Sequence, residues 1–146
     1  MALQETFLNI RGTKIQMLKG GNGDPLLYLH SAGGEIVELP FFTQLAQHHT
    51  VYIPAHPGFS QSEGLEKIDT IEDLCNPKLR DRLYRVTVPT LVLWGASDRL
   101  IPVAHGKAYH EGIDGSKFVL MEKCGHAPPL EKPEETVKIL REFFRG

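Results

Sequence analysis

Hydrophobic and polar residues alternate near the start of the chain and then give way to short, wholly apolar runs. Residues 6–10 and 13–19 alternate on either side of Arg11-Gly12, which predicts an antiparallel hairpin with one exposed face. The later apolar runs have the length of strands that are buried on both faces. They are residues 25–30, the beginning of residues 50–60, residues 89–95 and residues 116–122.

Between these runs, apolar residues recur at helical spacing. This spacing predicts a helix within residues 35–48, bent or delayed by Pro40. It also predicts one or two helices over residues 69–85, a short helix over 103–112 and an amphipathic helix over 133–144. Strands that alternate with helices after a first hairpin indicate an α/β fold with a mostly parallel sheet and helices on both faces.

Composition restricts the classes of partner. A chain of 146 residues, 41% hydrophobic and 23% charged, is expected to form a single domain over residues 1–146. Its net charge of −2 predicts no attraction to nucleic acid or to an anionic membrane. The first residues lack the pattern of a signal peptide, the apolar runs are too short to span a bilayer, and Cys75 and Cys124 lack metal-site spacing. We therefore expect a reduced, cytoplasmic chain without a cofactor or a bound metal.

Four segments stand out by their order along the chain: LLYLHSAGGE at 26–35, VYIPAHPGFSQSE at 51–63, VPTLVLWGASDRLIP at 88–102 and CGHAPPLEKPEE at 124–135. Together they resemble the α/β-hydrolase superfamily, in its small esterase, lactonase and C–C hydrolase branches. The resemblance implies that Asp98 and His126 are the acid and the base of a nucleophile–histidine–acid triad. It also implies that His30 begins an oxyanion loop, with the backbone N–H groups of Ala32 and Gly33 as donors. In the second segment, His56 and Ser60 depart from the pattern of the superfamily.

One part of the superfamily pattern is missing. Residues 68–74, IDTIEDL, resemble the helix that leads into the fifth strand, and residues 75–86, CNPKLRDRLYRV, resemble the approach to the acid-bearing strand. The fifth strand with its Gly-x-Ser-x-Gly nucleophile elbow, the sixth strand and the lid have no counterpart between them. The gap is on the order of a hundred residues. The resemblance thus implies an internal deletion with its junction near Leu74-Cys75.

Such a deletion leaves two arrangements open. Closed within one chain, it places residues 90–94 next to residues 25–29 in a sheet of about six strands, with right-handed crossovers. The alternative is a swapped or intertwined dimer, because a truncated sheet exposes apolar strand edges. Since the helices that covered the lost strands are also missing, we expect a homodimer or a larger homo-oligomer at micromolar concentration.

Two serines are candidates for the missing nucleophile. Ser97 ends Gly95-Ala96-Ser97, which matches half of an elbow, and Ser31 follows His30 in the oxyanion loop. Either serine would need His126 within hydrogen-bond reach, with Asp98 orienting the histidine. We favour Ser31, because the consecutive residues Ser97 and Asp98 can hardly both approach one histidine at the proper angles. The alternative interpretation is that Ser97 caps a turn and Ser31 bonds to the backbone of its own loop.

Cys124 is a further candidate, two residues from His126. A Cys–His pair can be reactive, but free cysteines are usually buried, so an inert thiol is the better interpretation.

Three functions are compatible with these features. The first is hydrolysis of small carboxylic esters or lactones by an incomplete or rebuilt Ser-His-Asp site. The second is a catalytically inactive remnant that binds a small acyl or aromatic ligand. The third is a dimerisation module that associates through exposed strand edges.

Overall fold

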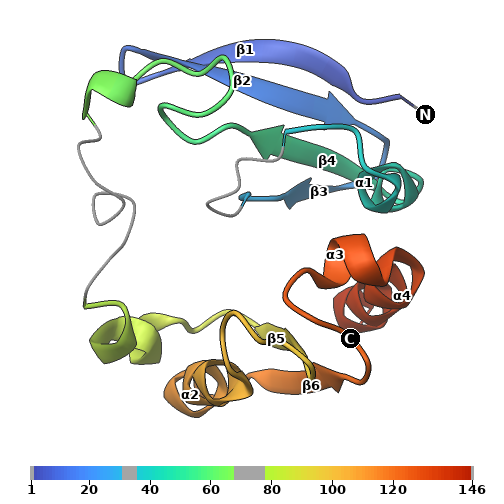
Figure 1. The fold of residues 1–146 in the computed structure, drawn as a ribbon. Coiled ribbons are helices and arrows are strands. Elements are labelled where there is room, and N and C mark those ends of the chain that lie inside the picture. The colour runs from blue at the N-terminus through green and yellow to red at the C-terminus, as the bar shows by residue number, and fades with distance from the viewer. Residues whose placement is uncertain (1, 31–35, 68–77, 146) are drawn as a thin grey trace. The chain divides into compact units, whose positions relative to one another are not determined.

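The computed structural model describes residues 2–30, 36–67 and 78–145. The chain divides into two compact units, residues 1–74 and residues 75–146, termed the N-terminal unit and the C-terminal unit. Figure 1 shows the elements of both units. The expected junction at Leu74-Cys75 and most of the helical pattern at 69–85 lie outside the described residues.

The N-terminal unit begins with the predicted hairpin. β1 (Gln4–Ile10) pairs antiparallel with β2 (Thr13–Gly20), and Ile10 lies opposite Thr13. Arg11 and Gly12 form a two-residue loop with φ angles of 52° and 85°, and two positive φ values are typical of a type I′ turn. Asn9 Oδ1 accepts a hydrogen bond from the Gly12 N–H at 2.9 Å. The predicted hairpin is confirmed.

Two further strands complete a mixed sheet in this unit. β4 (His49–Pro54) pairs antiparallel with β2 and parallel with β3 (Asp24–Leu27), which gives the order β1-β2-β4-β3. α1 (Pro40–Leu45) connects β3 to β4. It begins at Pro40, because proline has no N–H and suits the first position of a helix. A short 3₁₀ helix, η1 (Leu65–Lys67), follows.

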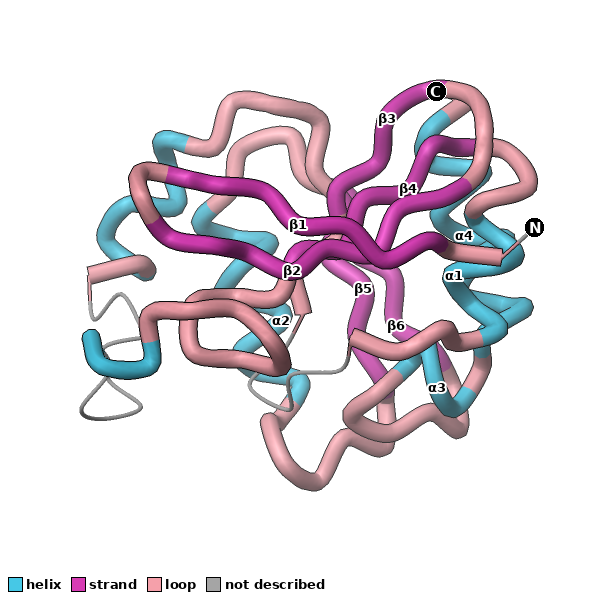
Figure 2. Tube along the Cα trace, turned by 90° about the horizontal axis from the view of Figure 1, so that it is seen from above, coloured by secondary structure: helices cyan, strands magenta, loops and turns pink. Residues whose placement is uncertain are grey.

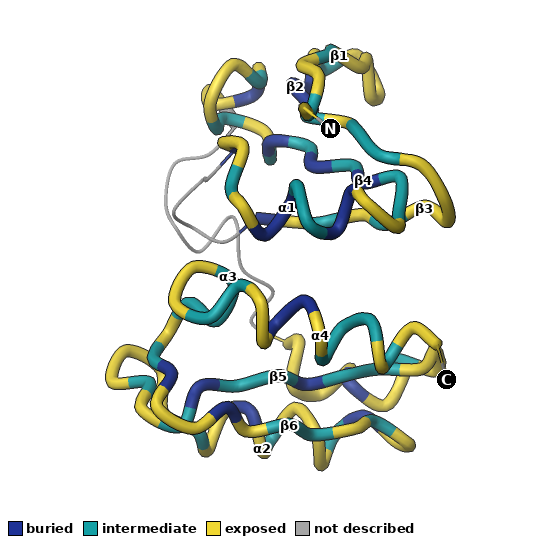
Figure 3. Tube along the Cα trace, turned by 90° about the vertical axis from the view of Figure 1, so that its right-hand side faces the viewer, coloured by how far each residue is buried: buried dark blue, intermediate teal, exposed yellow. Residues whose placement is uncertain are grey.

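The core of the N-terminal unit lies where α1 packs on β4. Phe41, Phe42 and Leu45 of α1 are buried together with Val51 and Ile53 of β4. These stretches appear in dark blue in Figure 3, whereas β1 is mostly exposed. The alternation in β4 therefore places Val51 and Ile53 on the face that α1 covers.

The C-terminal unit is built around two parallel strands. β5 (Leu91–Gly95) pairs with β6 (Lys117–Met121), and α2 (Val103–Gly112) connects them. Figure 2 shows the two strands side by side. A 3₁₀ helix, η3 (Arg80–Arg85), precedes β5, and α3 (Pro128–Glu131) and α4 (Pro133–Phe144) follow β6. These strands and the helices α2 and α4 confirm the predicted elements of this part of the chain.

The predicted mostly parallel sheet of about six strands is wrong. The described strands form a four-stranded sheet and a separate two-stranded sheet, and only the β3–β4 and β5–β6 pairs are parallel. The strand at 90–94 pairs with β6, and its expected place next to residues 25–29, which belong to the other unit, stays a prediction. Each parallel pair is joined by a single short crossover within its own unit, and the hairpin adds antiparallel strands to the first pair. The apolar runs predicted the positions of the strands along the chain, but they did not predict which strands pair.

Candidate functional site

Asp98 lies in the turn that follows β5. Two backbone hydrogen bonds tie this turn to the end of β6 and the segment after it: Ala96 N–H donates to Met121 O, and Ser97 N–H donates to Cys124 O, both at 2.8 Å. Gly95 allows this close approach, since a Cβ at this position would lie 1.9 Å from the carbonyl oxygen of Gly125. The strand end is thus fixed directly against the segment that carries His126.

The Asp98 carboxylate is almost fully buried and accepts three hydrogen bonds. Oδ1 accepts the N–H groups of Leu100 at 2.9 Å and Ile101 at 2.8 Å, and Oδ2 lies 3.0 Å from His126 Nδ1. Its side chain is 3% exposed. Burial by itself raises the pKa of Asp98, but the hydrogen bonds from Ile101, His126 and Leu100 together hold that pKa below its ordinary value of 3.8. Asp98 is therefore ionised at neutral pH.

His126 presents the opposite edge of its ring to solvent. Its side chain is 45% exposed, and within the described residues only Nδ1 has a hydrogen-bond partner. An ionised carboxylate can only accept, so Nδ1 carries the proton between the two groups, and Nε2 is the acceptor nitrogen whenever the ring is neutral. Asp98 and His126 thus form an acid–histidine pair with a free basic nitrogen.

Glu131 of α3 is a residue of this site that sequence reasoning missed. Its Oε2 accepts the N–H of Gly125 at 2.7 Å, and its Oε1 accepts the N–H of Ala127 at 2.9 Å. These hydrogen bonds, from Ala127 first and then Gly125, hold the pKa of Glu131 below its ordinary value of 4.5. The sequence signal is a glutamate in the first turn of a helix that opens with two prolines, where a capping-box side chain reaches back to the preceding backbone.

Of the two predicted nucleophiles only Ser97 lies in the described part of the chain, and it makes no hydrogen bond to His126. The Ser97 side chain is exposed, and its N–H is used in the bond to Cys124. Its hydroxyl makes no hydrogen bond to His126. Ser31, Ala32 and Gly33 lie outside the described residues, so their predicted roles stay predictions.

His30 is described in the N-terminal unit, where it is buried with 5% of its surface exposed. Its Nε2 accepts the N–H of His56 at 2.8 Å, and His56 Nε2 lies 3.1 Å from the His30 carbonyl oxygen. The ring also packs edge-on against Phe59, with centroids 4.9 Å apart. His30 therefore holds together the loop that follows β4.

Cys124 is buried and carries a free thiol. Burial raises the pKa of this thiol, and the negative charge of Glu131 adds to the effect. A thiol with a raised pKa is a poor nucleophile, because the thiolate is the reactive form. The expectation that Cys124 is buried is confirmed, and its lack of reactivity stays a prediction.

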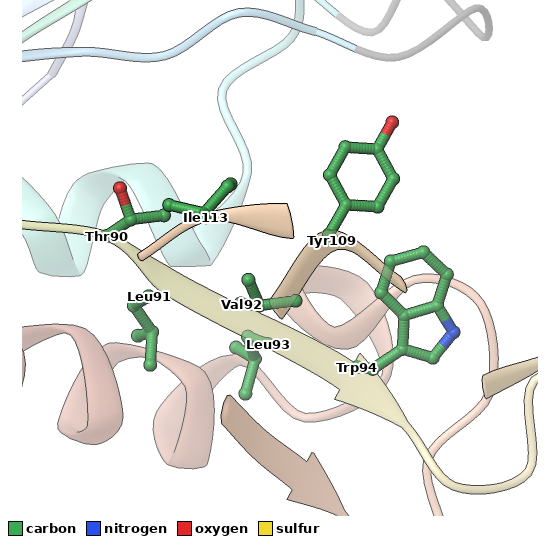
Figure 4. A pocket seen from close by; sticks show the side chains of 7 residues that line it. All are labelled: Thr90, Leu91, Val92, Leu93, Trp94, Tyr109 and Ile113. Carbon is green, nitrogen blue, oxygen red and sulfur yellow. The ribbon is translucent and has the colours of Figure 1, made fainter. Parts of the chain in front are cut away.

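An open hollow of about 350 Å³ runs along β5. Figure 4 shows Leu91 and Leu93 pointing to one side of the strand, and Val92 and Trp94 to the other, where Tyr109 and Ile113 also lie. Thr90 completes the lining. The lining includes neither Asp98 nor His126. The hollow is therefore an apolar surface beside the strand and not the position of the acid–histidine pair.

The described residues offer neither a metal-binding cluster nor a membrane-spanning helix. They contain no group of three or more His, Cys, Asp and Glu side chains that could hold a metal ion. None of the helices in the same residues is both long enough and apolar enough to cross a bilayer.

Comparison with known proteins gives relatives of one kind. No family model matches the chain. Monoacylglycerol lipase ABHD6 from Bos taurus is 28% identical over 77 residues, which are 53% of this chain and 23% of the lipase. Pimeloyl-acyl-carrier-protein methyl ester esterase from Neisseria meningitidis is 36% identical over 67 residues, 46% of this chain and 26% of the esterase. The matched segments thus span about a quarter of the length of these curated relatives.

A solved structure matches over a longer stretch. The esterase RhEst1 from Rhodococcus superposes with a TM-score of 0.79 at 14% identity, and the superposition covers 100% of this chain and 99% of the esterase chain. A likeness at this identity concerns the fold.

Proposed function

We propose that this chain, which is similar to a lipase and an esterase, hydrolyses small carboxylic esters or lactones. The observation that carries the proposal is the 3.0 Å hydrogen bond between His126 Nδ1 and Asp98 Oδ2. An orienting acid and a histidine with a free nitrogen are two of the three parts of a hydrolytic triad. The names of its relatives, a lipase and an esterase, support ester hydrolysis.

In this mechanism His126 is the general base. Its Nε2 takes the proton of a serine hydroxyl as the serine oxygen bonds to the ester carbonyl carbon, and the carbonyl electron pair moves to its oxygen. When the tetrahedral intermediate collapses, His126 gives the proton to the departing alkoxide, and water releases the acyl group by the same route. Asp98 stabilises the imidazolium that forms in each step.

Ser31 is our preferred nucleophile and Ser97 the alternative. Ser97 precedes Asp98 directly, and two consecutive residues can hardly both approach one histidine at the proper angles. Ser31 would act with the N–H groups of Ala32 and Gly33 as oxyanion donors, at a strand end where α/β sheets bind ligands.

The test is hydrolysis of a short-chain aryl ester by the purified chain and by His126→Ala. We expect the native chain to exceed the buffer rate and His126→Ala to match the buffer, because the variant has no base. His105→Ala, at an exposed position of α2 in the same unit, is the matched control and should keep full activity. Equal rates for the native chain and His126→Ala would contradict the proposal. Labelling with a fluorophosphonate and peptide mapping then distinguishes Ser31 from Ser97.

A second candidate function is a catalytically inactive remnant that binds a small apolar ligand. The apolar hollow along β5 favours it. This function predicts the result that contradicts hydrolysis, namely equal rates for the native chain and His126→Ala.

We also propose that the chain forms a homodimer in the cytoplasm. Leu27 at the end of β3 and the nearby Leu29 are 63% and 58% exposed, and apolar side chains on the outermost strand of a sheet favour association. Light scattering at micromolar concentration should return about twice the 16.3 kDa mass of one chain. A mass of one chain would rule out the dimer at these concentrations.

A further inference from the structure

We propose that Glu131 is a positioning residue that orients His126 by holding the backbone on both sides of it. The inference rests on the proposed function in that His126 is taken as the base. It adds Glu131 to Asp98 as a second side chain that orients the base.

The two hydrogen bonds of Glu131 hold the backbone at the start of Gly125 and at the end of His126. The Gly125 N–H precedes the Cα of His126 and the Ala127 N–H follows it, at 2.7 Å and 2.9 Å from the two carboxylate oxygens. Because each oxygen is engaged by a different N–H, rotation of the carboxylate breaks both bonds at once. Charged acceptors also make stronger hydrogen bonds than neutral ones. The Glu131 carboxylate alone thus fixes the backbone that directs the His126 side chain towards Asp98.

The backbone around Glu131 is itself held in place by several hydrogen bonds. Its N–H and that of Leu130 donate to Ala127 O at 2.9 Å, and Lys132 N–H donates to Pro128 O at 2.9 Å. The hydroxyl of Thr136, a residue only 1% exposed, donates to the same Pro128 oxygen at 3.0 Å. The turn of α3 therefore cannot shift without breaking bonds to a buried residue.

A helix cap alone does not account for this arrangement. Capping α3 requires a bond to Ala127, the residue before its first turn. The shorter bond goes to Gly125, which lies outside the helix on the far side of His126. Pro128 and Pro129 have no N–H to offer, so the carboxylate of Glu131 reaches past them to the two N–H groups that control the histidine.

The test measures the His126 ring directly, by nitrogen-15 NMR of the full chain at neutral pH. In the native chain we expect the proton on Nδ1 and a lone pair on Nε2. In Glu131→Ala we expect the two tautomers to average, because the ring is no longer directed to Asp98. Glu131→Gln should give an intermediate spectrum, since an amide has one acceptor oxygen for the two N–H groups.

Glu135→Gln is the matched control, because Glu135 bonds to Lys132 and to neither backbone group beside His126. It should leave the His126 signals unchanged. In ester hydrolysis, Glu131→Ala should lower kcat by about 10²-fold with little change in KM, as expected for a misplaced catalytic group.

Native tautomer signals in Glu131→Ala would overturn the inference, and if that variant does not fold, native signals in Glu131→Gln do the same. A native chain with the Asp98-paired tautomer but no esterase activity would refute the proposed function alone, because the NMR comparison does not depend on turnover.

Discussion

We expect Asp98→Asn to lower kcat for the proposed ester hydrolysis by about 10⁴-fold, the size of effect that follows when a triad histidine is held in the wrong tautomer. In the native chain the N–H groups of Leu100 and Ile101 donate to Oδ1 of Asp98. The side-chain oxygen of an asparagine can accept the same two hydrogen bonds. The amide NH₂ then faces His126 Nδ1 and must donate to it, so the ring proton moves to Nε2. With its proton on Nε2, His126 cannot accept one from a nucleophile. Steady-state kinetics on an aryl ester measures the change.

Asp114→Asn is the control for this substitution. Asp114 is exposed and follows α2, so its replacement should leave kcat unchanged. Thermal unfolding of Asp98→Asn should show a folded chain, which separates a wrong tautomer from a lost fold. Retention of a tenth or more of the native kcat would mean that Asp98 does not orient the base.

Gly95→Ala lowers the free energy of unfolding of the C-terminal unit by about 3 kcal/mol, at the upper end of what overpacking usually costs. The new methyl group would lie 1.9 Å from Gly125 O and 2.5 Å from Cys124 O. Both atoms are backbone, so the contact is relieved only when the end of β5 moves away from the histidine segment. Urea denaturation followed by the fluorescence of Trp94, which adjoins Gly95, measures the loss.

Gly112→Ala provides the comparison, because the three atoms nearest to its methyl group all belong to the Leu83 side chain, the first at 2.8 Å. A side chain can change rotamer, so this variant should lose much less stability than Gly95→Ala. If the two variants were equally stable, the tight contact between β5 and the histidine segment would not be a constraint.

The local elements of this fold could be predicted from the sequence, but not the way in which the strands combine. The alternation on both sides of Arg11-Gly12 indicates which side chains share a face of each strand, and it leaves two residues for the loop. Together these determine how the two strands pair. The apolar runs that became β3 and β5 contain no such information. A run of apolar residues indicates a buried strand and says nothing about its neighbour, and for this reason the single six-stranded sheet was wrong.

The candidate site shows the same division. Asp98 and His126 were identified because each follows a strand within a segment that resembles the α/β hydrolases, and the structure brings them to 3.0 Å. Glu131 was missed because an acidic residue in the first turn of a helix already has an ordinary explanation in the helix dipole. Its proposed role depends on the path of the backbone at Gly125, six residues earlier. The periodicity of side chains carries no information about that path.

The turn around His126 has a consequence for how the site assembles during folding. Its hydrogen bonds join residues between Gly125 and Thr136, and the bonds of Glu131 close loops with sequence separations of 6 and 4. The bond from His126 to Asp98 closes a separation of 28. Loop-closure entropy rises with the length of the loop, and local contacts form faster than distant ones. The backbone contacts proposed to orient His126 therefore lie within a dozen residues. Most of the loop-closure entropy lost in forming the Asp98–His126 pair comes from bringing Asp98 to this turn.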